Sequence, residues 1–235
     1  MIPSLVERNP IPELMDDPAL DPAEHAQALR GLARINAWSR SDAFLWPVLE
    51  EVSRRKGGNP IKVLDVATGA GDVPIALWGR AVAVRLPIEL FGCDVSPTAV
   101  QHATNAAAAA NARIRFFEHD VLRDPLPERY DLIVCSLFLH HLSEEEAVTL
   151  LARMRDAADA VAINDLSRSK LNYILVWIAA RLLSRSPVVH FDGPASVQSA
   201  FTPAEAKALA ERAGMANATV HRRFPCRFLM TWTWW

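Results

Sequence analysis

Two glycines follow an apolar run in the stretch Val63-Leu-Asp-Val-Ala-Thr-Gly-Ala-Gly-Asp-Val-Pro74. An apolar strand that ends in a glycine turn begins many nucleotide-binding sites, because glycine lets a ligand approach the backbone closely. A dinucleotide fingerprint needs a third small residue three positions after the second glycine, where this chain has Pro74. Asp72 adds a carboxylate where a helix start would face a pyrophosphate, and no Gly-Lys-Ser/Thr follows for a P-loop. The turn therefore suits a ligand without a pyrophosphate.

Other side chains that can do chemistry follow later apolar runs. Asp94 ends IELFGCD (88–94), Asp120 follows RIRFFEH (113–119), and His140 and His141 follow YDLIVCSLF (130–138). In an open α/β sheet, ligands bind at the carboxyl ends of the parallel strands. If these runs are strands of one sheet, the polar side chains gather at one edge of it.

The elements that must position these residues alternate along the chain. Apolar runs from IKVLDVA (61–67) to AVAINDL (160–166) are separated by helical patterns, which predicts a parallel sheet with helices on both faces. Ser96-Pro97, Ser143 and the capping box Thr202-Pro-Ala-Glu205 are typical helix starts. Asp21-Pro-Ala-Glu24 shows the same start for a long N-terminal helix, HAQALRGLARINAWSR.

The alternation of predicted strands and helices ends after the fifth apolar run. A mostly helical insertion is followed by a helix from about 203 to 213 and by two further runs, ATVHRRFP and CRFLMTWTW, which a short turn joins into an antiparallel pair. The prediction is an α/β fold with a seven-stranded, mostly parallel sheet whose last strand is antiparallel. We predict four parts: an N-terminal helical cap (1–58), a core (59–166), a helical lid insertion (167–201), and a C-terminal helix and hairpin that complete the sheet (202–235).

The pattern Asp65-x-Ala67-x-Gly69-x-Gly71, with Asp94 closing the next strand, resembles the first two motifs of class I S-adenosylmethionine-dependent methyltransferases. Within that family the chain is most similar to ubiquinone/menaquinone-type and small-molecule methyltransferases. The resemblance covers about residues 60–166 and implies a Rossmann-like core that binds S-adenosylmethionine. Ala67 stands where the family has its first glycine, which we interpret as a subfamily variant.

The resemblance also implies a role for individual residues. The glycine turn would bracket the methionine part of the cofactor, Asp94 would accept hydrogen bonds from both ribose hydroxyls, and Asp120 would lie near the adenine amino group. Asp65 would help to hold the ammonium, Val95 would pack on the adenine, Val121 would donate its backbone N–H, and Ser136 and Leu137 would lie beside the sulfonium. The expected cofactor-binding residues are Asp65, Ala67, Gly69, Gly71, Asp94, Val95, Asp120, Val121, Ser136 and Leu137.

Methyl transfer to an oxygen usually needs a group that removes a proton, and positioning contributes much of the rate. His140 and His141 are the candidate catalytic bases, because a neutral imidazole suits a phenol or enol proton. A histidine before a helix can instead be a cap or a packing residue. Both interpretations stay open at this point.

The apolar segment LNYILVWIAARLL (171–183) predicts a helix that is buried, covers a ligand or binds a partner. We interpret it as the wall or lid of an apolar acceptor pocket, with core packing as the alternative. His190 and Asp192 then fall on an expected loop, SPVVHFDGPASVQSAF, and the N-terminal helix would close over the cofactor. The candidate substrate-binding residues are Arg34, Trp38, Tyr173, Trp177 and His190.

Composition limits the remaining classes of function. The net charge of −2 and the lack of a basic run with aromatics argue against a nucleic-acid partner. Cys93, Cys135 and Cys226 lack metal-ligand spacing and suit reduced core residues, so we expect no metal. The first residues, MIPSLVERNPIPELMDDP, lack a signal-peptide pattern, and LNYILVWIAARLL is too short to span a bilayer. We expect a cytoplasmic protein without a membrane span, and an oligomer stays open.

The leading hypothesis is an S-adenosylmethionine-dependent O-methyltransferase of a phenolic or polyketide-like, largely apolar small molecule. A quinone-type C-methyltransferase is the enzymatic alternative, and methylation of nitrogen stays open. A non-catalytic S-adenosylmethionine-binding regulatory protein is the alternative from another class, because the fold alone does not decide the activity.

Overall fold

The computed structural model describes residues 3–16, 19–21, 23–24, 27–28, 31 and 41–235. Its centre is a seven-stranded sheet in the order β3-β2-β1-β4-β5-β7-β6. The strands are β1 (Ile61–Val66), β2 (Ile88–Asp94), β3 (Ile114–Glu118), β4 (Tyr130–Ser136), β5 (Ala158–Leu166), β6 (Thr219–Arg223) and β7 (Arg227–Thr233). β1 to β5 are parallel to one another, whereas β7 is antiparallel to both of its neighbours, β5 and β6. The predicted mixed sheet with an antiparallel last strand is confirmed.

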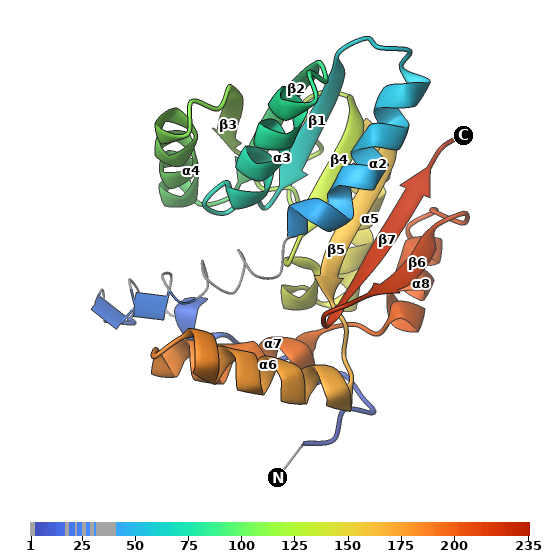
Figure 1. Cartoon of the computed structure of the whole chain (residues 1–235). Helices are drawn as coiled ribbons and strands as arrows, with labels where there is room; N and C mark the ends of the chain where they lie inside the picture. Colours follow the sequence, from blue (N-terminus) through green and yellow to red (C-terminus); the bar gives the residue numbers. More distant parts are fainter. Residues whose placement is uncertain (1–2, 17–18, 22, 25–26, 29–30, 32–40) are drawn as a thin grey trace.

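Helices cover both faces of the sheet (Figure 1). Successive side chains of a strand point to opposite faces, so Val63 joins one apolar core and Leu64 the other. The first core includes side chains of α2 (Ser41–Arg55) and α3 (Asp72–Ala83), and the second includes those of α5 (Glu144–Ala157) and α8 (Pro203–Arg212). α4 (Pro97–Ala109) lies over β2 and β3. Both cores hold the carboxyl ends of β1, β2 and β4 in place.

The predicted helix starts are confirmed where the structure describes them. The Ser96 hydroxyl accepts a hydrogen bond from the Ala99 backbone N–H at the start of α4. Ser143 and Thr202 form capping boxes at the starts of α5 and α8. The helix expected in HAQALRGLARINAWSR falls mostly outside the described residues, and α2, which the sequence did not predict, packs against the sheet. The division into four parts stays a prediction.

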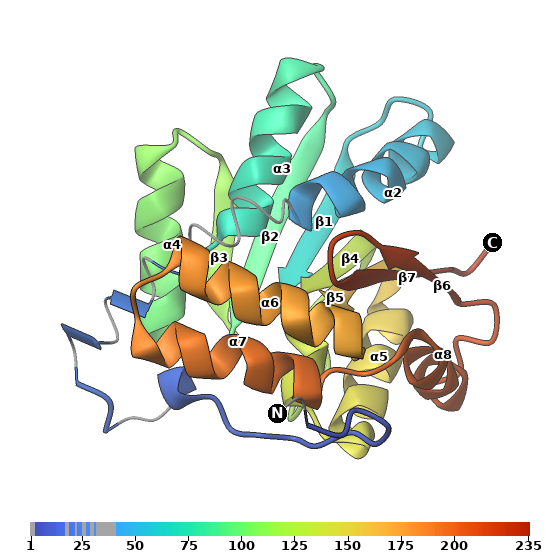
Figure 2. The same cartoon turned by 60° about the horizontal axis from the view of Figure 1, so that its bottom comes forward.

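The segment after β5 forms two antiparallel helices, α6 (Lys170–Leu183) and α7 (Pro187–Ser199), beyond the carboxyl end of the sheet (Figures 1 and 2). The expectation of a loop at residues 186–201 was wrong, because α7 occupies most of this stretch. Gly193 and Pro194, residue types that disfavour a helix interior, lie inside this helix. A Cβ on Gly193 would lie 3.1 Å from the Val176 Cγ1 atom, so the glycine permits close packing of α6 against α7.

Residues 3–16 run along α7, as the N-terminal segment in Figure 2 shows. They include the short helix η1 (Leu14–Asp16), and a second short helix, η2 (Leu139–His141), follows β4. The buried Asp192 carboxylate accepts hydrogen bonds from the backbone N–H groups of Leu14 (2.7 Å) and Met15 (3.2 Å). Among the described helices, none is long and apolar enough to cross a membrane.

Candidate functional site

The backbone of the turn after β1 would let a ligand approach it closely. Ala67, Gly69 and Gly71 have positive φ angles of 54°, 53° and 82°. A Cβ on Gly69 would meet nothing within 4 Å, whereas one on Gly71 would lie 3.0 Å from the Ala103 Cβ and 3.1 Å from the Phe116 Cζ. Gly71 is therefore required by packing against α4 and β3, and Gly69 leaves open space in front of the turn.

Asp94 joins the loops that follow β1 and β2. Its Oδ2 atom accepts a hydrogen bond from the Gly69 backbone N–H at 2.9 Å, and its Oδ1 atom accepts one from the Ser96 N–H, also at 2.9 Å. A carboxylate has about four acceptor positions, so this half-buried group keeps capacity for two ligand hydroxyls. The adjacent Val95 side chain is 61% exposed and offers an apolar surface.

Asp65 lies buried near the end of β1, where its Oδ2 atom accepts a hydrogen bond from the Thr68 hydroxyl at 2.7 Å. Burial raises the pKa of its carboxyl group to about 7, and the nearby charges of Asp94 and Asp72 act in the same direction. A cationic ligand group at this edge would stabilise the ionised form of Asp65.

Asp120 forms the turn after β3. Its Oδ1 atom accepts hydrogen bonds from the backbone N–H groups of Leu122 (2.9 Å) and Arg123 (3.2 Å). The Val121 side chain is buried, and its carbonyl accepts a hydrogen bond from Arg153 at 2.8 Å. These contacts hold the loop after β3 beside the loop after β2, since the His119 N–H donates to the Asp94 carbonyl at 2.9 Å.

Ser136 and Leu137 end β4 next to Asn164 of β5. The Asn164 side-chain amide donates to the Ser136 hydroxyl at 3.0 Å, and the Leu137 N–H donates to the Asn164 carbonyl at 2.9 Å. Asn164 is fully buried, and within the part of the chain that the structure describes its Oδ1 atom has no hydrogen-bond partner. A buried polar atom without a partner is costly, which marks this point as a place for a ligand or water.

The two histidines lie in different environments. His140 is buried, and its Nδ1 atom lies 2.7 Å from the Oδ1 atom of the buried Asp165. On the other side of the ring, the His140 Nε2 atom lies 3.7 Å from the Oε1 atom of Glu13. Burial alone would lower the pKa of His140, but the carboxylates of Asp165 and Glu13 outweigh it and raise the pKa to about 9. His141 is more exposed, and its Nε2 atom lies 4.0 Å from the same Glu13 oxygen.

The structure places the candidate acceptor-side residues on α6 and α7. Tyr173 is half-buried, and Trp177 is 43% exposed with the Arg181 guanidinium 3.8 Å from its ring centre. His190 lies on α7, and its Nε2 atom is 2.9 Å from the Ser184 carbonyl oxygen. Arg34 and Trp38 lie outside the described residues. α6, the helix expected to form the lid, exposes apolar side chains such as Leu182, which is 78% exposed.

Sequence reasoning missed three residues of this region: Glu13, Asn164 and Asp165. Asn164 and Asp165 could have been predicted, because they are polar residues near the end of the apolar run AVAINDL, as Asp94 is at the end of IELFGCD. Glu13 gave no such signal, since it lies in an irregular segment far from the histidines in sequence.

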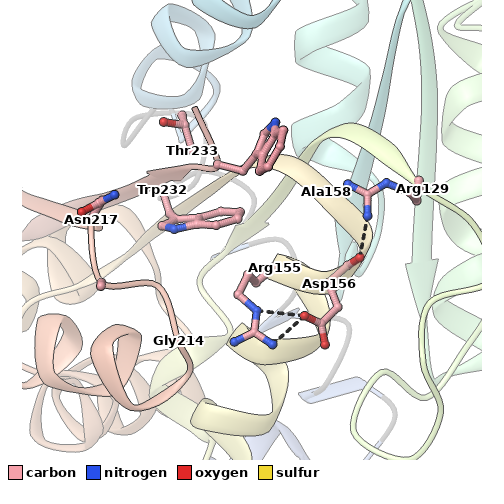
Figure 3. Close-up of a pocket in the computed structure, with 10 residues that line it drawn as sticks. Arg129, Arg155, Asp156, Ala158, Gly214, Asn217, Trp232 and Thr233 are labelled. Carbon is pink, nitrogen blue, oxygen red and sulfur yellow. Dashed lines mark hydrogen bonds and ion pairs between the residues drawn. The ribbon is translucent and has the colours of Figure 1, made fainter.

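A hollow of about 430 Å³ lies at the other end of the sheet (Figure 3). Trp232, Gly214 and the ion pair between Arg155 and Asp156 line it, next to Ala158 at the start of β5. It adjoins the amino end of a parallel strand, whereas ligands of such sheets bind at the carboxyl ends. We therefore do not assign the candidate site to this hollow.

Comparison with known proteins gives matches over this core. Residues 63–159 match the family model described as "Methyltransferase domain". A demethylmenaquinone methyltransferase of Deinococcus radiodurans is 38% identical over 87 residues, which are 37% of this chain and 34% of that protein. A ubiquinone biosynthesis O-methyltransferase of Pseudomonas fluorescens is 23% identical over 172 residues, 69% of this chain and 72% of that protein.

Among solved structures, the plantazolicin methyltransferase BpumL, in complex with a desmethyl analog and S-adenosylhomocysteine, matches with a TM-score of 0.66 and 15% identity. The match covers 90% of each chain, which shows a shared fold. The chain spans 34% and 38% of the lengths of the two demethylmenaquinone methyltransferases that it matches.

Proposed function

We propose that this chain, whose residues 63–159 match the methyltransferase-domain family model, is a class I S-adenosylmethionine-dependent methyltransferase that transfers a methyl group from S-adenosylmethionine to a small, largely apolar acceptor. The observation that carries the proposal is the joined pair of loops at the carboxyl ends of β1 and β2. There the Asp94 carboxylate holds the Gly69 N–H and keeps free acceptor positions at the edge of the sheet.

The described residues fit this cofactor. The open space at Gly69 accepts a ligand against the backbone, and the Asp94 carboxylate suits a pair of ribose hydroxyls. The exposed Val95 side chain provides an apolar contact for a base, and Asp65 provides a carboxyl group for an ammonium. Asp72 in the first turn of α3 disfavours a pyrophosphate in its place.

When bound, S-adenosylmethionine supplies a methyl group that its positive sulfonium already activates, so the chain mainly has to position an acceptor and exclude water. Ser136, Leu137 and Asn164 lie at the end of β4 and β5, where the acceptor would meet the methyl group. His141 is the better candidate base of the histidine pair, because it is partly exposed while both ring nitrogens of His140 face carboxylates. α6 and α7 would cover an apolar acceptor, with Tyr173 and Trp177 as its contacts.

We propose O-methylation of a phenolic or polyketide-like molecule as the leading reaction. Methylation of a quinone-type acceptor is the second candidate, favoured by two matched relatives that are named demethylmenaquinone methyltransferase. The acceptor atom and a cytoplasmic location belong to the same set of proposals.

Two measurements test this function. Calorimetry should detect binding of S-adenosylhomocysteine to the wild type and strongly weakened binding to Asp94→Ala. Asp124→Ala is the matched control, because Asp124 is an exposed carboxylate in the neighbouring loop after β3. Equal affinity in Asp94→Ala and the wild type would refute the cofactor assignment.

The second measurement is methyl transfer from labelled S-adenosylmethionine to a panel of phenols, quinols and amines, with the modified atom found by NMR. A product methylated on a phenol oxygen supports the leading reaction, and one methylated on a quinol ring carbon supports the alternative. Binding of S-adenosylhomocysteine without transfer to any compound class would favour the non-catalytic binding protein.

A further inference from the structure

We propose that Glu13, His140 and His141 form a binding site for a divalent transition-metal ion at the acceptor side of the candidate active site. The site joins the N-terminal segment to η2, which directly follows β4. Each of the three residues offers one ligand atom, and these atoms all lie within 4.8 Å of one another. The proposal rests on the arrangement of these protein groups.

The distances suit a common ion. Metal–nitrogen and metal–oxygen bonds of such sites measure about 2.0–2.2 Å, so two ligand atoms on one ion lie roughly 3–4 Å apart. The Glu13 Oε1 atom lies 3.7 Å from the His140 Nε2 atom and 4.0 Å from the His141 Nε2 atom. The His141 side chain is 30% exposed, so a small rotation of its ring can complete the set.

The surrounding groups already orient the ligands. Asp165 accepts the hydrogen on Nδ1 of His140 at 2.7 Å, so Nε2 is the ring nitrogen that faces Glu13, and an ion bound there would displace the proton that Nε2 carries. This carboxylate–imidazole arrangement is the usual second shell of a metal-bound histidine. Ser196 donates its hydroxyl to the Glu13 carboxylate, and Arg8 holds η2 through the carbonyls of His140 (2.8 Å) and Leu142 (2.6 Å).

The electrostatic surroundings also favour a cation. Glu13 and Asp165 place two carboxylates around one buried imidazole, and both are largely withdrawn from solvent. A buried cluster of this kind is stabilised by a positive charge between its members. A divalent ion provides that charge together with directed bonds.

The ligand set predicts the class of metal. Two imidazoles and one carboxylate suit zinc, iron, cobalt or nickel, whereas magnesium and calcium prefer sites made entirely of oxygen ligands. Three protein ligands leave at least one position open for water or for an acceptor oxygen. The use of that position by an acceptor rests on the proposed function, but binding of the metal does not. With the ion bound, His141 would no longer be a free base, and the ion would instead favour loss of the proton by lowering the pKa of an acceptor hydroxyl.

The test is metal binding by the full-length chain after treatment with a chelator. Calorimetric titration with Zn²⁺ and visible absorption on titration with Co²⁺ should both show one ion per chain. Glu13→Gln and His141→Ala should weaken binding by at least the roughly 10- to 100-fold loss that removal of a second-shell partner causes. His102→Ala is the matched control, because His102 is an exposed histidine on α4 and should leave the affinity unchanged.

Two results would overturn the proposal: no binding by the wild type, or equal affinity in the wild type and the Glu13 and His141 variants. Asp165→Asn adds a conservative variant that keeps the shape of the second shell, and it should lose about 10- to 100-fold in affinity. Circular dichroism must show that each variant is folded. Binding of S-adenosylhomocysteine by the wild type, measured separately, distinguishes failure of the metal site from failure of the proposed function.

Discussion

The buried carboxyl group of Asp65 lowers the stability of the folded chain at neutral pH. In the unfolded chain its pKa has the ordinary value of 3.8, and burial raises the pKa to about 7 in the folded chain. Between these values the folded state binds a proton that the unfolded state releases, so the stability falls as the pH rises. The full penalty is present above pH 7 and is on the order of a few kcal/mol, since one unit corresponds to about 1.4 kcal/mol.

Asp65→Asn should therefore raise the free energy of unfolding, and it should do so more at pH 8 than at pH 5. The asparagine keeps an oxygen that can accept the Thr68 hydrogen bond. Urea unfolding of both proteins at the two pH values measures the difference. The same substitution should weaken S-adenosylhomocysteine binding if the charge of Asp65 holds the ammonium. An equal stability gain at both pH values would show that the carboxyl group does not titrate in this range.

Gly71, the N-cap residue of α3, and Gly79, inside α3, allow a matched comparison of two glycine-to-alanine substitutions. Gly71→Ala places a Cβ at 3.0 Å from Ala103 Cβ with a φ of 82°, so it should lower the free energy of unfolding by roughly 1–3 kcal/mol. Gly79 lies inside α3, where a Cβ meets nothing within 4 Å, and Gly79→Ala should raise stability by about 0.5–1 kcal/mol. Opposite signs in thermal or urea unfolding are expected. A stabilising Gly71→Ala would contradict the packing argument.

At the scale of elements, Arg168 connects the N-terminal segment, the insertion and α8. Its side chain is fully buried and donates to the carbonyls of Leu5 (3.2 Å) and Ala200 (2.6 Å) and to both oxygens of Glu205. Removing one partner of a fully buried ion pair costs about 3–5 kcal/mol. Here Arg168 is fully buried but the Glu205 side chain is 40% exposed, so we expect a loss near the lower end of that range.

Arg168→Ala should thus lower the free energy of unfolding by several kcal/mol and increase proteolysis within residues 3–16. Arg212→Ala is the control, because its ion pair with Glu144 is exposed and such pairs contribute about 0–1 kcal/mol. Urea unfolding and limited proteolysis measure the two effects. Similar losses for both variants would show that burial does not strengthen the Arg168 network.

The elements also show what local sequence can predict. The starts of α4, α5 and α8 could be predicted from their N-cap residues Ser96, Ser143 and Thr202, because a cap interacts only with the first turn of its own helix. α7 escaped prediction because Gly193 and Pro194 are local helix breakers, and its close packing against α6 is a tertiary property. The mostly parallel sheet could be predicted from the alternation of elements, whereas the order of its strands was not predicted.

At the scale of the whole molecule, the residues of the candidate site that follow strands could be predicted from the sequence, whereas a residue brought in from a distant irregular segment could not. Asp94 and Asp120 were readable because each ends or follows a strand, and parallel strands bring such ends together. Glu13 was not readable, since its contact with His140 depends on how the N-terminal segment crosses α7 and η2. Long-range placement of an irregular segment leaves no periodic trace in the sequence.

The central sheet also controls the reactivity of the cysteines. Cys93 in β2 and Cys135 in β4 are buried, and burial raises the pKa of the Cys93 thiol to about 12 and that of Cys135 well above its usual value. Cys226 is only partly buried, in the turn before β7. Because the thiolate is the reactive form, alkylation at pH 8 should modify Cys226 first, and Cys135 only when the sheet opens.

A ligand that binds only the folded state reduces the population of that open state. At a concentration 100 times its dissociation constant, S-adenosylhomocysteine should stabilise the protein by about 2.7 kcal/mol and slow labelling of Cys135 by roughly 100-fold. Mass spectrometry of labelled peptides follows each cysteine, and Cys226 serves as the internal control whose rate stays nearly constant. Labelling of Cys135 as fast as that of Cys226, or at a rate independent of the ligand, would mean that Cys135 becomes accessible through a local opening of the sheet. Such an opening would leave the loops that bind the ligand intact. Protection of Cys135 alone would instead mean that occupancy of the loops after β1 and β2 is coupled to opening of the entire sheet.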